Sequence, residues 1–324
     1  MHVVLTGVAG FIGSALVQRL LTDGHSVLGI DDMSTGQMEN MAWAADNPLL
    51  TLIKSDVAGP PAREAMSSSE AEVFLHLAAR MDVRGSVLDP IGDARCNILG
   101  CLSVLESARV AGASHVIFAS SGGTIYGDQE LPINESVRPD PHSPYAASKV
   151  CGEVYLAVYR HLYNLPSTIL ALGNVYGPGQ NPYGETGVVS IFASALLEGR
   201  PTKILGGGDA TRDYVYIDDV VEAFVRAAGS AGKGLRLNIG TGRETSVRDL
   251  HRVIAAAVRR PDRPTFLPAR AGELQRVALD CTAARDVLGW QARIGLEEGI
   301  FRTVASLRNS SGAATASNLT DAAP

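Results

Sequence analysis

The sequence predicts an α/β protein, built on a doubly wound parallel sheet with a smaller, interleaved C-terminal domain. Short apolar runs, typical of strands covered on both faces, are followed by segments with helical spacing through the first half of the 324 residues. The first apolar run passes directly into a glycine-rich turn and a helix, the order expected at a ligand-binding sheet edge. Hydrophobic residues make up 46% of the chain, enough for a sizeable core.

Each element can be placed from its pattern. Strands are expected at residues 2–6, 26–30, 50–53, 73–79, 115–119 and 167–172. Helices are expected at residues 14–21, at 98–111 and from Gly187 to near Gly199. We expect residues 1–175 to bind a cofactor, with later segments crossing back, residues 176–306 to bind a substrate, and residues 307–324, rich in Ser, Ala and Asn, to form a disordered tail.

Charge and composition exclude several classes of function. The net charge of −6 gives no electrostatic basis for binding nucleic acid or an anionic membrane. No apolar run has the length of a membrane span, and no signal peptide is expected because the first strand begins at His2. The cysteines show no metal-ligand spacing, so we expect free thiols, no metal and a cytoplasmic location: Cys96, Cys101, Cys151 and Cys281.

The first strand and the turn after it predict a Rossmann-type dinucleotide site. A strand, a turn with glycines three residues apart and a helix place backbone N–H groups against a pyrophosphate. The cofactor contacts expected in this turn are Gly7, Gly10, Phe11, Ile12 and Gly13. The end of the fourth strand has small residues that allow the cofactor to approach the backbone: Leu77, Ala78 and Ala79. On the same strand we interpret His76 as structural.

The end of the second strand predicts which dinucleotide binds. Asp31 lies in the expected window after the glycines, where a carboxylate accepts both hydroxyls of the adenosine ribose and repels a 2′-phosphate. No Arg occurs in residues 31–36, so we predict NAD rather than NADP. The same loop supplies the further expected cofactor contacts Asp32, Ser34, Thr35 and Gly36.

Tyr145 and Lys149 are the expected catalytic pair. Four residues apart on a helix, they share one face. An ammonium nearby favours the phenolate, which predicts Tyr145 as a general base near neutral pH. The fifth strand delivers Ser120, Ser121 and Thr124 to the carboxyl edge of the sheet, where a hydroxyl can bond a substrate and pass its proton to Tyr145.

These motifs resemble known proteins along the chain to about residue 303. The GxxGxxG turn resembles the extended branch of the short-chain dehydrogenase/reductase superfamily. The SSGGTIYG segment at residues 120–127 and SPYAASK at residues 143–149 look like the UDP-glucose 4-epimerase family of nucleotide-sugar enzymes. The resemblance implies tightly held NAD, a UDP-sugar whose C4 hydroxyl loses its proton to Tyr145, a 4-keto sugar that turns over and takes the hydride back, and a homodimer formed through helices 98–111 and 145–163.

The resemblance also implies further site residues. Near the cofactor they are Asp56, Val57 and Asn97, the last bracing the active-site strand; for Asp56, a turn or helix-capping role stays open. On the diphosphate and uridine they are Asn174, Arg212, Arg270 and Glu273. Other expected substrate contacts are Arg80, Val188, Val189, Thr202, Ile204 and Tyr214, together with the hydroxyls Ser120, Ser121 and Thr124.

The chain departs from the family at two positions. Gly122 occupies the usual place of the catalytic Ser or Thr, so the hydroxyl must come from Ser121, Ser120 or Thr124, and we rank Ser121 first because it is the immediate neighbour. Gly179 stands where relatives often have an Arg, which removes one cation near the sugar.

Several alternatives stay open. The Gly122-Gly123 pair disfavours a 4,6-dehydratase or a uronate decarboxylase, both of which want carboxylates there. A UDP-glucuronate 4-epimerase is a closer rival, with Arg80, Arg84 and Arg276 as possible cations for the C6 carboxylate. Val277 replaces a bulkier gate of relatives, so a 2-acetamido sugar is a further possibility. From another class, the chain could be a non-catalytic NAD-sensing protein on this fold.

Overall fold

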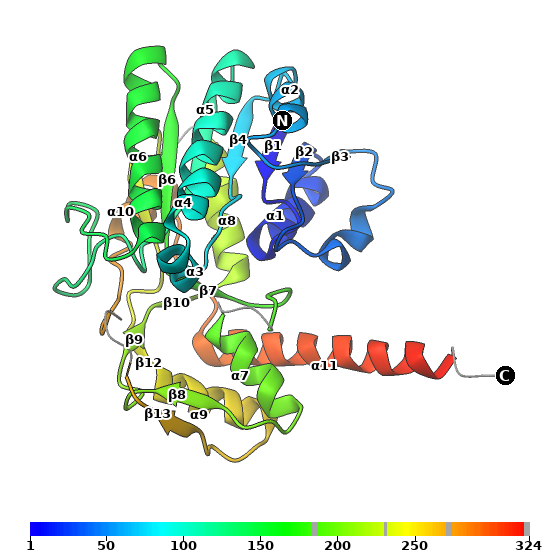
Figure 1. Cartoon of the computed structure of the whole chain (residues 1–324), viewed down its shortest axis with the longest axis vertical. Helices are drawn as coiled ribbons and strands as arrows, with labels where there is room; N and C mark the ends of the chain where they lie inside the picture. Colours follow the sequence, from blue (N-terminus) through cyan, green and yellow to red (C-terminus); the bar gives the residue numbers. More distant parts are fainter. Residues whose placement is uncertain (183–186, 230–231, 270–273, 321–324) are drawn as a thin grey trace.

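A seven-stranded parallel sheet forms the centre of the computed structural model, which describes residues 1–182, 187–229, 232–269 and 274–320, with side chains to residue 309 (Figure 1). From one edge to the other its strands are β11 (Arg236–Ile239), β6 (Ser167–Leu172), β5 (His115–Ser120), β4 (Val73–His76), β1 (His2–Thr6), β2 (Ser26–Asp31) and β3 (Leu50–Lys54). The predicted fold class is confirmed.

The six strands expected from the sequence are all present, and one of them is shorter. β4 ends at His76 instead of residue 79. After it the Leu77 N–H bonds the Thr6 carbonyl at 3.2 Å, and the Ala78 N–H bonds the Thr6 hydroxyl at 3.2 Å. These bonds turn residues 77–79 away from the strand ladder at the carboxyl edge, so the apolar run is longer than the strand.

Helices cover both faces of the sheet, as the doubly wound pattern requires. α1 (Phe11–Thr22) and α8 (Ile217–Ala228) pack together on one face, and α2 (Pro60–Ser67), α5 (Gly100–Val110) and α6 (Pro144–Tyr163) on the other (Figure 1). β1 shows the division: Val3 and Leu5 belong to the apolar core with α1 and α8, whereas Val4 belongs to the core with α2 and α5.

A smaller group of elements lies below the sheet in the view of Figure 1. Its helices α7 (Val188–Leu197), α9 (Val247–Val258) and α11 (Leu296–Thr320) pack on one another. Its short strands pair as β8 (Lys203–Leu205) with β13 (Thr265–Leu267), and β9 (Thr211–Arg212) with β12 (Thr245–Ser246). Within the described part of the chain, no helix combines the length and apolarity needed to cross a membrane.

Two aspartates of the segment RDYVYIDD, residues 212–219, hold the two groups of elements together. Asp213, fully buried beside β10 (Tyr214–Tyr216), accepts the Thr241, Gly242 and Leu279 N–H groups at 2.7, 3.0 and 3.1 Å, and also the Thr241 hydroxyl. Asp219 accepts the Arg293 and Ile294 N–H groups, both at 3.0 Å. This motif therefore has a structural role besides any contact with a substrate.

The helix expected at residues 98–111 begins much earlier. α4 (Pro90–Ala94) starts at a proline behind Asp89, whose carboxylate accepts the Gly92 N–H, and a π-helical turn, η2 (Arg95–Leu99), joins α4 to α5. Proline at the first helical position and an aspartate cap are strong start signals. Asn97 therefore lies inside the helical segment and does not head it.

The C-terminal segment also differs from the prediction. A disordered tail was expected from residue 307, but α11 continues to Thr320. Alanine is the strongest helix former, and Ala313, Ala314 and Ala316 fall in this stretch. Residues 321–324 lie outside the described part of the chain.

We expect Asp213→Ala to be strongly destabilising. The change removes the acceptor of three backbone N–H groups, one in a buried and two in partly buried hydrogen bonds, and an unsatisfied buried group costs about 1–3 kcal/mol. The free energy of unfolding should fall by at least about 3 kcal/mol in a denaturant titration. Asp209→Ala is the matched control, because the Asp209 side chain is 84% exposed. Equal unfolding midpoints for the two variants would contradict the structural role of Asp213.

Candidate active site

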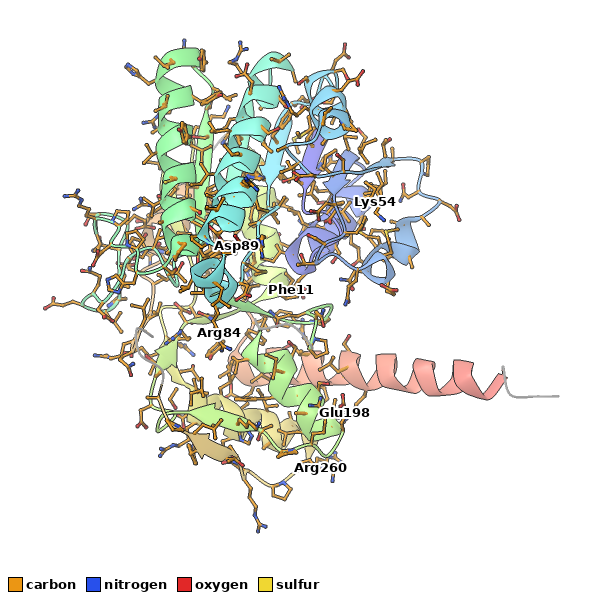
Figure 2. The ribbon with its side chains drawn as sticks, viewed as in Figure 1. Phe11, Lys54, Arg84, Asp89, Glu198 and Arg260 are labelled. Carbon is orange, nitrogen blue, oxygen red and sulfur yellow. The ribbon has the colours of Figure 1, made fainter. Side chains whose placement is uncertain are left out.

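The glycine turn after β1 forms a narrow backbone cradle. Gly7 has a φ of +73°, and a Cβ built on it would lie 2.8 Å from the Ala78 nitrogen. A Cβ on Gly13 would lie 1.9 Å from the Gly7 carbonyl oxygen. α1 starts at Phe11 (labelled in Figure 2), and neither a side-chain cap nor an acidic residue occupies its first turn. The N–H groups there can meet a pyrophosphate, so the cradle fits the predicted dinucleotide.

Asp31 closes this cradle at the end of β2. Its two carboxylate oxygens accept the Ala9 and Met33 N–H groups, both at 2.9 Å. A carboxylate offers about four acceptor positions, so capacity remains for two ribose hydroxyls. Burial raises the pKa of Asp31, against the lowering effect of the two N–H groups. A Cβ on Gly36 would lie 2.8 Å from Asp31 Oδ1, which explains the glycine in this loop.

The other predicted cofactor residues divide into two sets. Residues 77–79 are partly exposed beside the glycine turn, where a ligand could contact them. His76 is buried and bonds the Thr6 hydroxyl at 2.8 Å, which confirms its structural position, and burial lowers its pKa to about 3. Asp56 Oδ1 accepts the Ala58 N–H at 2.8 Å, so this side chain has the turn role that the sequence left open. Val57 packs in the core.

Asn97 acts on the chain itself in this structure. Its amide accepts the Arg80 N–H at 2.9 Å and donates to the Arg80 carbonyl at 3.0 Å and to Asp93 Oδ1 at 2.9 Å. The side chain is 4% exposed, so any effect on a cofactor passes through the backbone after β4. The resemblance implied bracing of the active-site strand, whereas the bonds in the structure brace the segment after β4.

Tyr145 and Lys149 both lie buried on one face of α6. Lys149 Nζ donates to the Ala119 carbonyl at 2.9 Å and lies 5.0 Å above the Phe118 ring and 5.9 Å from the Tyr145 ring centre. Burial lowers the pKa of Lys149 to about 8. The same burial raises the pKa of Tyr145 to about 12, although the nearby Ser121 side chain acts to lower it.

The prediction that Lys149 brings the pKa of Tyr145 close to neutrality is therefore wrong for the protein alone. The argument from the sequence counted the attraction of a nearby ammonium and left out desolvation. In the structure desolvation dominates for both groups, because each side chain lies away from water.

The three candidate hydroxyls have different partners. The Ser121 side chain lies close enough to Tyr145 to lower the pKa of that phenol. Ser120, 4% exposed, donates its hydroxyl to Glu153, so it faces α6 rather than a substrate. Thr124 donates to the Ser121 carbonyl at 3.4 Å, a local turn contact. Of the three, only Ser121 has its hydroxyl at the catalytic pair in the described residues.

Gly122 leaves no room for the hydroxyl that the family pattern places there. A Cβ on this residue would lie 2.7 Å from Leu279 Cδ1 and 2.9 Å from the Ala171 carbonyl oxygen. Distances under 3.0 Å require something to move, and a strand carbonyl moves less readily than a side chain. The absence of a Ser at this position therefore has a steric cause.

The predicted substrate residues come from several elements. Asn174 begins β7 (Asn174–Tyr176), and its Oδ1 would lie 3.3 Å from a Cβ on Gly123, which places the amide beside the end of β5. Arg212 is partly buried in β9, next to the buried Tyr214. Arg270 and Glu273 fall outside the described residues.

Other predicted substrate contacts have side chains in the core. Val189 and Ile204 are 1% exposed, and the Thr202 hydroxyl bonds His251 Nε2 at 2.7 Å. Val188 is only partly buried and packs against the same core. These positions can meet a ligand through their backbone, but the side chains of Val189, Thr202 and Ile204 are already in use. Alternation along the short strand and the helical turn puts them inside, which the motif match did not show.

The cations considered for a C6 carboxylate already have anionic partners in two cases. Arg80 pairs with Asp89 at 3.1 Å, and Arg276 forms a bidentate pair with Glu244. Arg84 is exposed on α3 (Val83–Leu88), on the side of the sheet that faces the smaller group of elements in Figure 2.

The sequence analysis missed several buried polar residues around the pair. Ser86 accepts the Tyr145 N–H at 3.2 Å, and Asp93 accepts the Ser148 hydroxyl. Glu153 binds both Ser120 and Arg236. A helical wheel would have found Glu153, because it lies on the Tyr145 face two turns along α6. Nothing in the sequence pattern points to Asp93 or Ser86.

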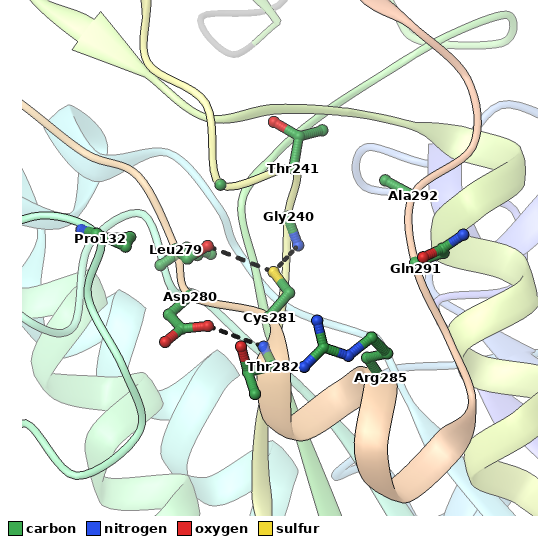
Figure 3. A pocket seen from close by; sticks show the side chains of 11 residues that line it. Pro132, Gly240, Thr241, Leu279, Asp280, Cys281, Thr282, Arg285, Gln291 and Ala292 are labelled. Atoms are coloured by element: carbon green, nitrogen blue, oxygen red, sulfur yellow. Dashed lines mark hydrogen bonds between the residues drawn. The ribbon is translucent and has the colours of Figure 1, made fainter.

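A separate cavity of about 330 Å³ lies beside α10 (Thr282–Leu288) (Figure 3). Cys281 stands in its wall, accepting the Gly240 N–H at 3.2 Å. None of the residues predicted for catalysis, cofactor or substrate lines this cavity. Among the described residues no group of three His, Cys, Asp or Glu side chains is arranged to hold a metal.

A dinucleotide cradle and a buried Tyr–Lys pair at the carboxyl edge of a parallel sheet define a Rossmann-type protein equipped for nicotinamide chemistry. The chain belongs to the NAD dependent epimerase/dehydratase family, whose model matches residues 3–240. This family assignment confirms NAD as the predicted cofactor.

Individual relatives agree with this assignment. The chain is 52% identical over 312 residues to a UDP-glucose 4-epimerase of Mycolicibacterium smegmatis, covering 96% of this chain and 100% of that one. A Thermotoga maritima UDP-glucose 4-epimerase solved with UDP-glucose is 38% identical, with a TM-score of 0.91 over 96% of this chain and 100% of the other. A Thermus thermophilus UDP-glucose 4-epimerase solved with NAD is 37% identical, with a TM-score of 0.86 over the same shares. The resemblance found in the motifs is confirmed.

We expect Gly13→Ala to lose NAD. A methyl group 1.9 Å from the Gly7 carbonyl forces the turn open and removes N–H groups from the pyrophosphate. Affinity for NAD should fall at least about tenfold, equivalent to ~1.4 kcal/mol, in a titration of the purified protein. Gly295→Ala is the control, because a Cβ there meets nothing within 4 Å. Unchanged NAD affinity in Gly13→Ala would contradict the assignment of the cradle.

Proposed function

We propose that this chain is an NAD-dependent UDP-hexose 4-epimerase, which inverts C4 of UDP-glucose and UDP-galactose through a transient 4-keto sugar. The observation that carries the proposal is the buried Tyr145–Lys149 pair, which lies beside the end of β5 at the same carboxyl edge of the sheet as the NAD cradle. The relatedness to UDP-glucose 4-epimerases over almost the whole chain supports the choice of substrate.

The chain's own groups manage the proton at O4. Tyr145 removes the proton of the C4 hydroxyl and returns it when the ring is reduced on its other face. Ser121, whose side chain lies beside Tyr145, donates to the sugar oxygen as charge develops on it. Lys149, held by the Ala119 carbonyl, keeps a positive charge near both.

When bound, NAD supplies a hydride acceptor and donor for C4 together with a positively charged ring. The pKa of Tyr145, about 12 in the protein alone, is sensitive to a charge nearby because a buried site screens charges poorly. Burial therefore keeps Tyr145 protonated in the empty protein and makes its deprotonation depend on a filled site.

A neutral C6 hydroxymethyl group suits the site better than a carboxylate. Arg80 and Arg276 have anionic partners in Asp89 and Glu244, and Gly179 supplies no charge. A hexuronate would have to break one of these pairs or use the exposed Arg84 on α3. The UDP-glucuronate 4-epimerase alternative is therefore second, and Val277, 1% exposed, leaves a 2-acetamido sugar to be tested beside it.

The test is turnover by the purified protein of UDP-glucose, UDP-glucuronate and UDP-GlcNAc, followed by separation of the C4 epimers. We expect UDP-glucose to react fastest. Tyr145→Phe should keep NAD and lose about 10³-fold in kcat, the scale of a lost general base. Ser121→Ala should lose about 10²-fold.

Ser103→Ala is the control for Ser121, since it removes a partly buried hydroxyl from α5. That hydroxyl donates to the Val57 carbonyl. Full activity of Tyr145→Phe would refute the assigned base. A wild-type protein that binds NAD and converts none of the three sugars would favour the NAD-sensing alternative.

We also infer a homodimer formed through α5 and α6. Exposed apolar side chains form a stripe along α6, which touches α5 through the Tyr159 hydroxyl and Glu106. The stripe consists of Val154, Tyr155, Val158, Leu162 and Tyr163, and two further exposed apolar residues, Leu99 of η2 and Val110, flank α5. A second copy of the chain presenting the same surface would cover them.

Val158→Glu combined with Leu162→Glu should convert the dimer into a monomer, because two carboxylates would be buried without partners. Light scattering after size-exclusion chromatography measures the change. Phe301→Glu is the control, since Phe301 is 64% exposed and lies on α11, not on α5 or α6. A wild-type monomer would refute the inferred dimer.

A cytoplasmic location is inferred as well, because all four cysteines are free thiols. Residues 1–175, with α8 and β11, would hold the cofactor, and the smaller group of elements would hold the nucleotide of the substrate.

A further inference from the structure

The end of β5 is tied to α6 by three consecutive residues. The three side chains that they meet lie at successive turns of one face of α6, so the strand end is fixed against that stretch of the helix. Two of the contacts are hydrogen bonds, from Lys149 Nζ to the Ala119 carbonyl at 2.9 Å and from the Ser120 hydroxyl to Glu153 Oε1. In the third, the Ser121 side chain lies beside Tyr145. Two of these contacts involve the catalytic pair, and the one with Glu153 lies behind it.

Glu153 is an unusual residue for this position. Its side chain is 5% exposed, and a buried carboxylate is costly unless it is paired and hydrogen-bonded. One oxygen accepts the Ser120 hydroxyl, and the other accepts Nε and one terminal nitrogen of Arg236, at 2.8 and 2.5 Å. Each oxygen therefore has its own partner.

Arg236 carries the contact on to the edge of the sheet. It is the first residue of β11, which pairs with β6. Its guanidinium lies 5.6 Å from the centre of the Tyr126 ring, in the segment that follows Ser121. Glu153 is thus held between the strand that ends in Ser121 and a strand from the second half of the chain.

We propose that Glu153 is a positioning residue for the epimerase reaction: through Ser120 and Arg236 it sets the register of α6 against the end of β5, and so the distance between Tyr145 and Ser121. The inference rests on the proposed function. Catalytic groups tolerate shifts of only about 0.5 Å. A slip of one residue along a helix is about 1.5 Å, larger than that tolerance.

The competing explanation is that Glu153 and Arg236 form an ion pair that only stabilises the fold. A change at Ser120 distinguishes this explanation from a positioning role. Ser120→Ala removes the contact to the strand and leaves the Glu153–Arg236 pair intact, so the protein should fold. Glu153→Gln instead leaves the partly buried Arg236 without its charge partner and should be less stable. Ser120→Ala is therefore the principal variant, and Glu153→Gln is the second.

The measurements are kcat and KM for UDP-glucose, bound NAD, and the isotope effect on turnover of UDP-glucose deuterated at C4. We expect Ser120→Ala to lower kcat about tenfold with KM within about twofold and NAD retained, since misplacement weakens the chemical step alone. The isotope effect should rise, because that step then limits turnover to a greater extent. A smaller folded fraction would lower the apparent kcat and leave the isotope effect unchanged.

The double variant Ser120→Ala/Glu153→Gln should be no slower than Glu153→Gln alone, because both changes break one contact. Glu298→Gln, which breaks an exposed Glu–Arg pair on α11, should match the wild type. A wild-type kcat and isotope effect in Ser120→Ala would overturn the inference while leaving the proposed function standing. A wild-type protein without epimerase activity would overturn both.

Discussion

The reactivity of this protein depends on the removal of one phenol from water. Burial raises the pKa of Tyr145 to about 12 and lowers that of Lys149 to about 8, so desolvation acts on both partners more strongly than they act on each other. A dry site has a compensating property: charges that arrive there are poorly screened. The same burial that makes Tyr145 a weak acid in the empty protein therefore makes it responsive to what binds.

Around Tyr145 and Lys149, backbone groups and buried carboxylates form most of the contacts that shape the site. The NAD cradle is made of glycines whose neighbours leave no space for a side chain, and Asp31 is oriented by two N–H groups. Asp213 and Asp219 bind loops that return from the second half of the chain. These hydrogen bonds bring segments that are far apart in the sequence to the carboxyl edge of the sheet.

Much of this could be predicted from the sequence, and the failures have physical causes. The strands, the cradle and the Tyr145–Lys149 spacing follow from local periodicity, which depends on a few neighbouring residues. The pKa of Tyr145, the partner of Ser120 and the burial of Thr202 depend on packing between distant segments, which periodicity does not report. The start of the helix at Pro90 was a local signal that the longer apolar pattern obscured.

The crowding at Gly122 limits which residues this position can accept. A side chain there would meet the Ala171 carbonyl, and no replacement of another residue can remove a carbonyl from a strand. A smaller residue in place of Leu279 would remove one close contact and leave the one with the Ala171 carbonyl. A serine at residue 122 would thus require the end of β6 to move as well, and no change of a neighbouring side chain can substitute for that movement.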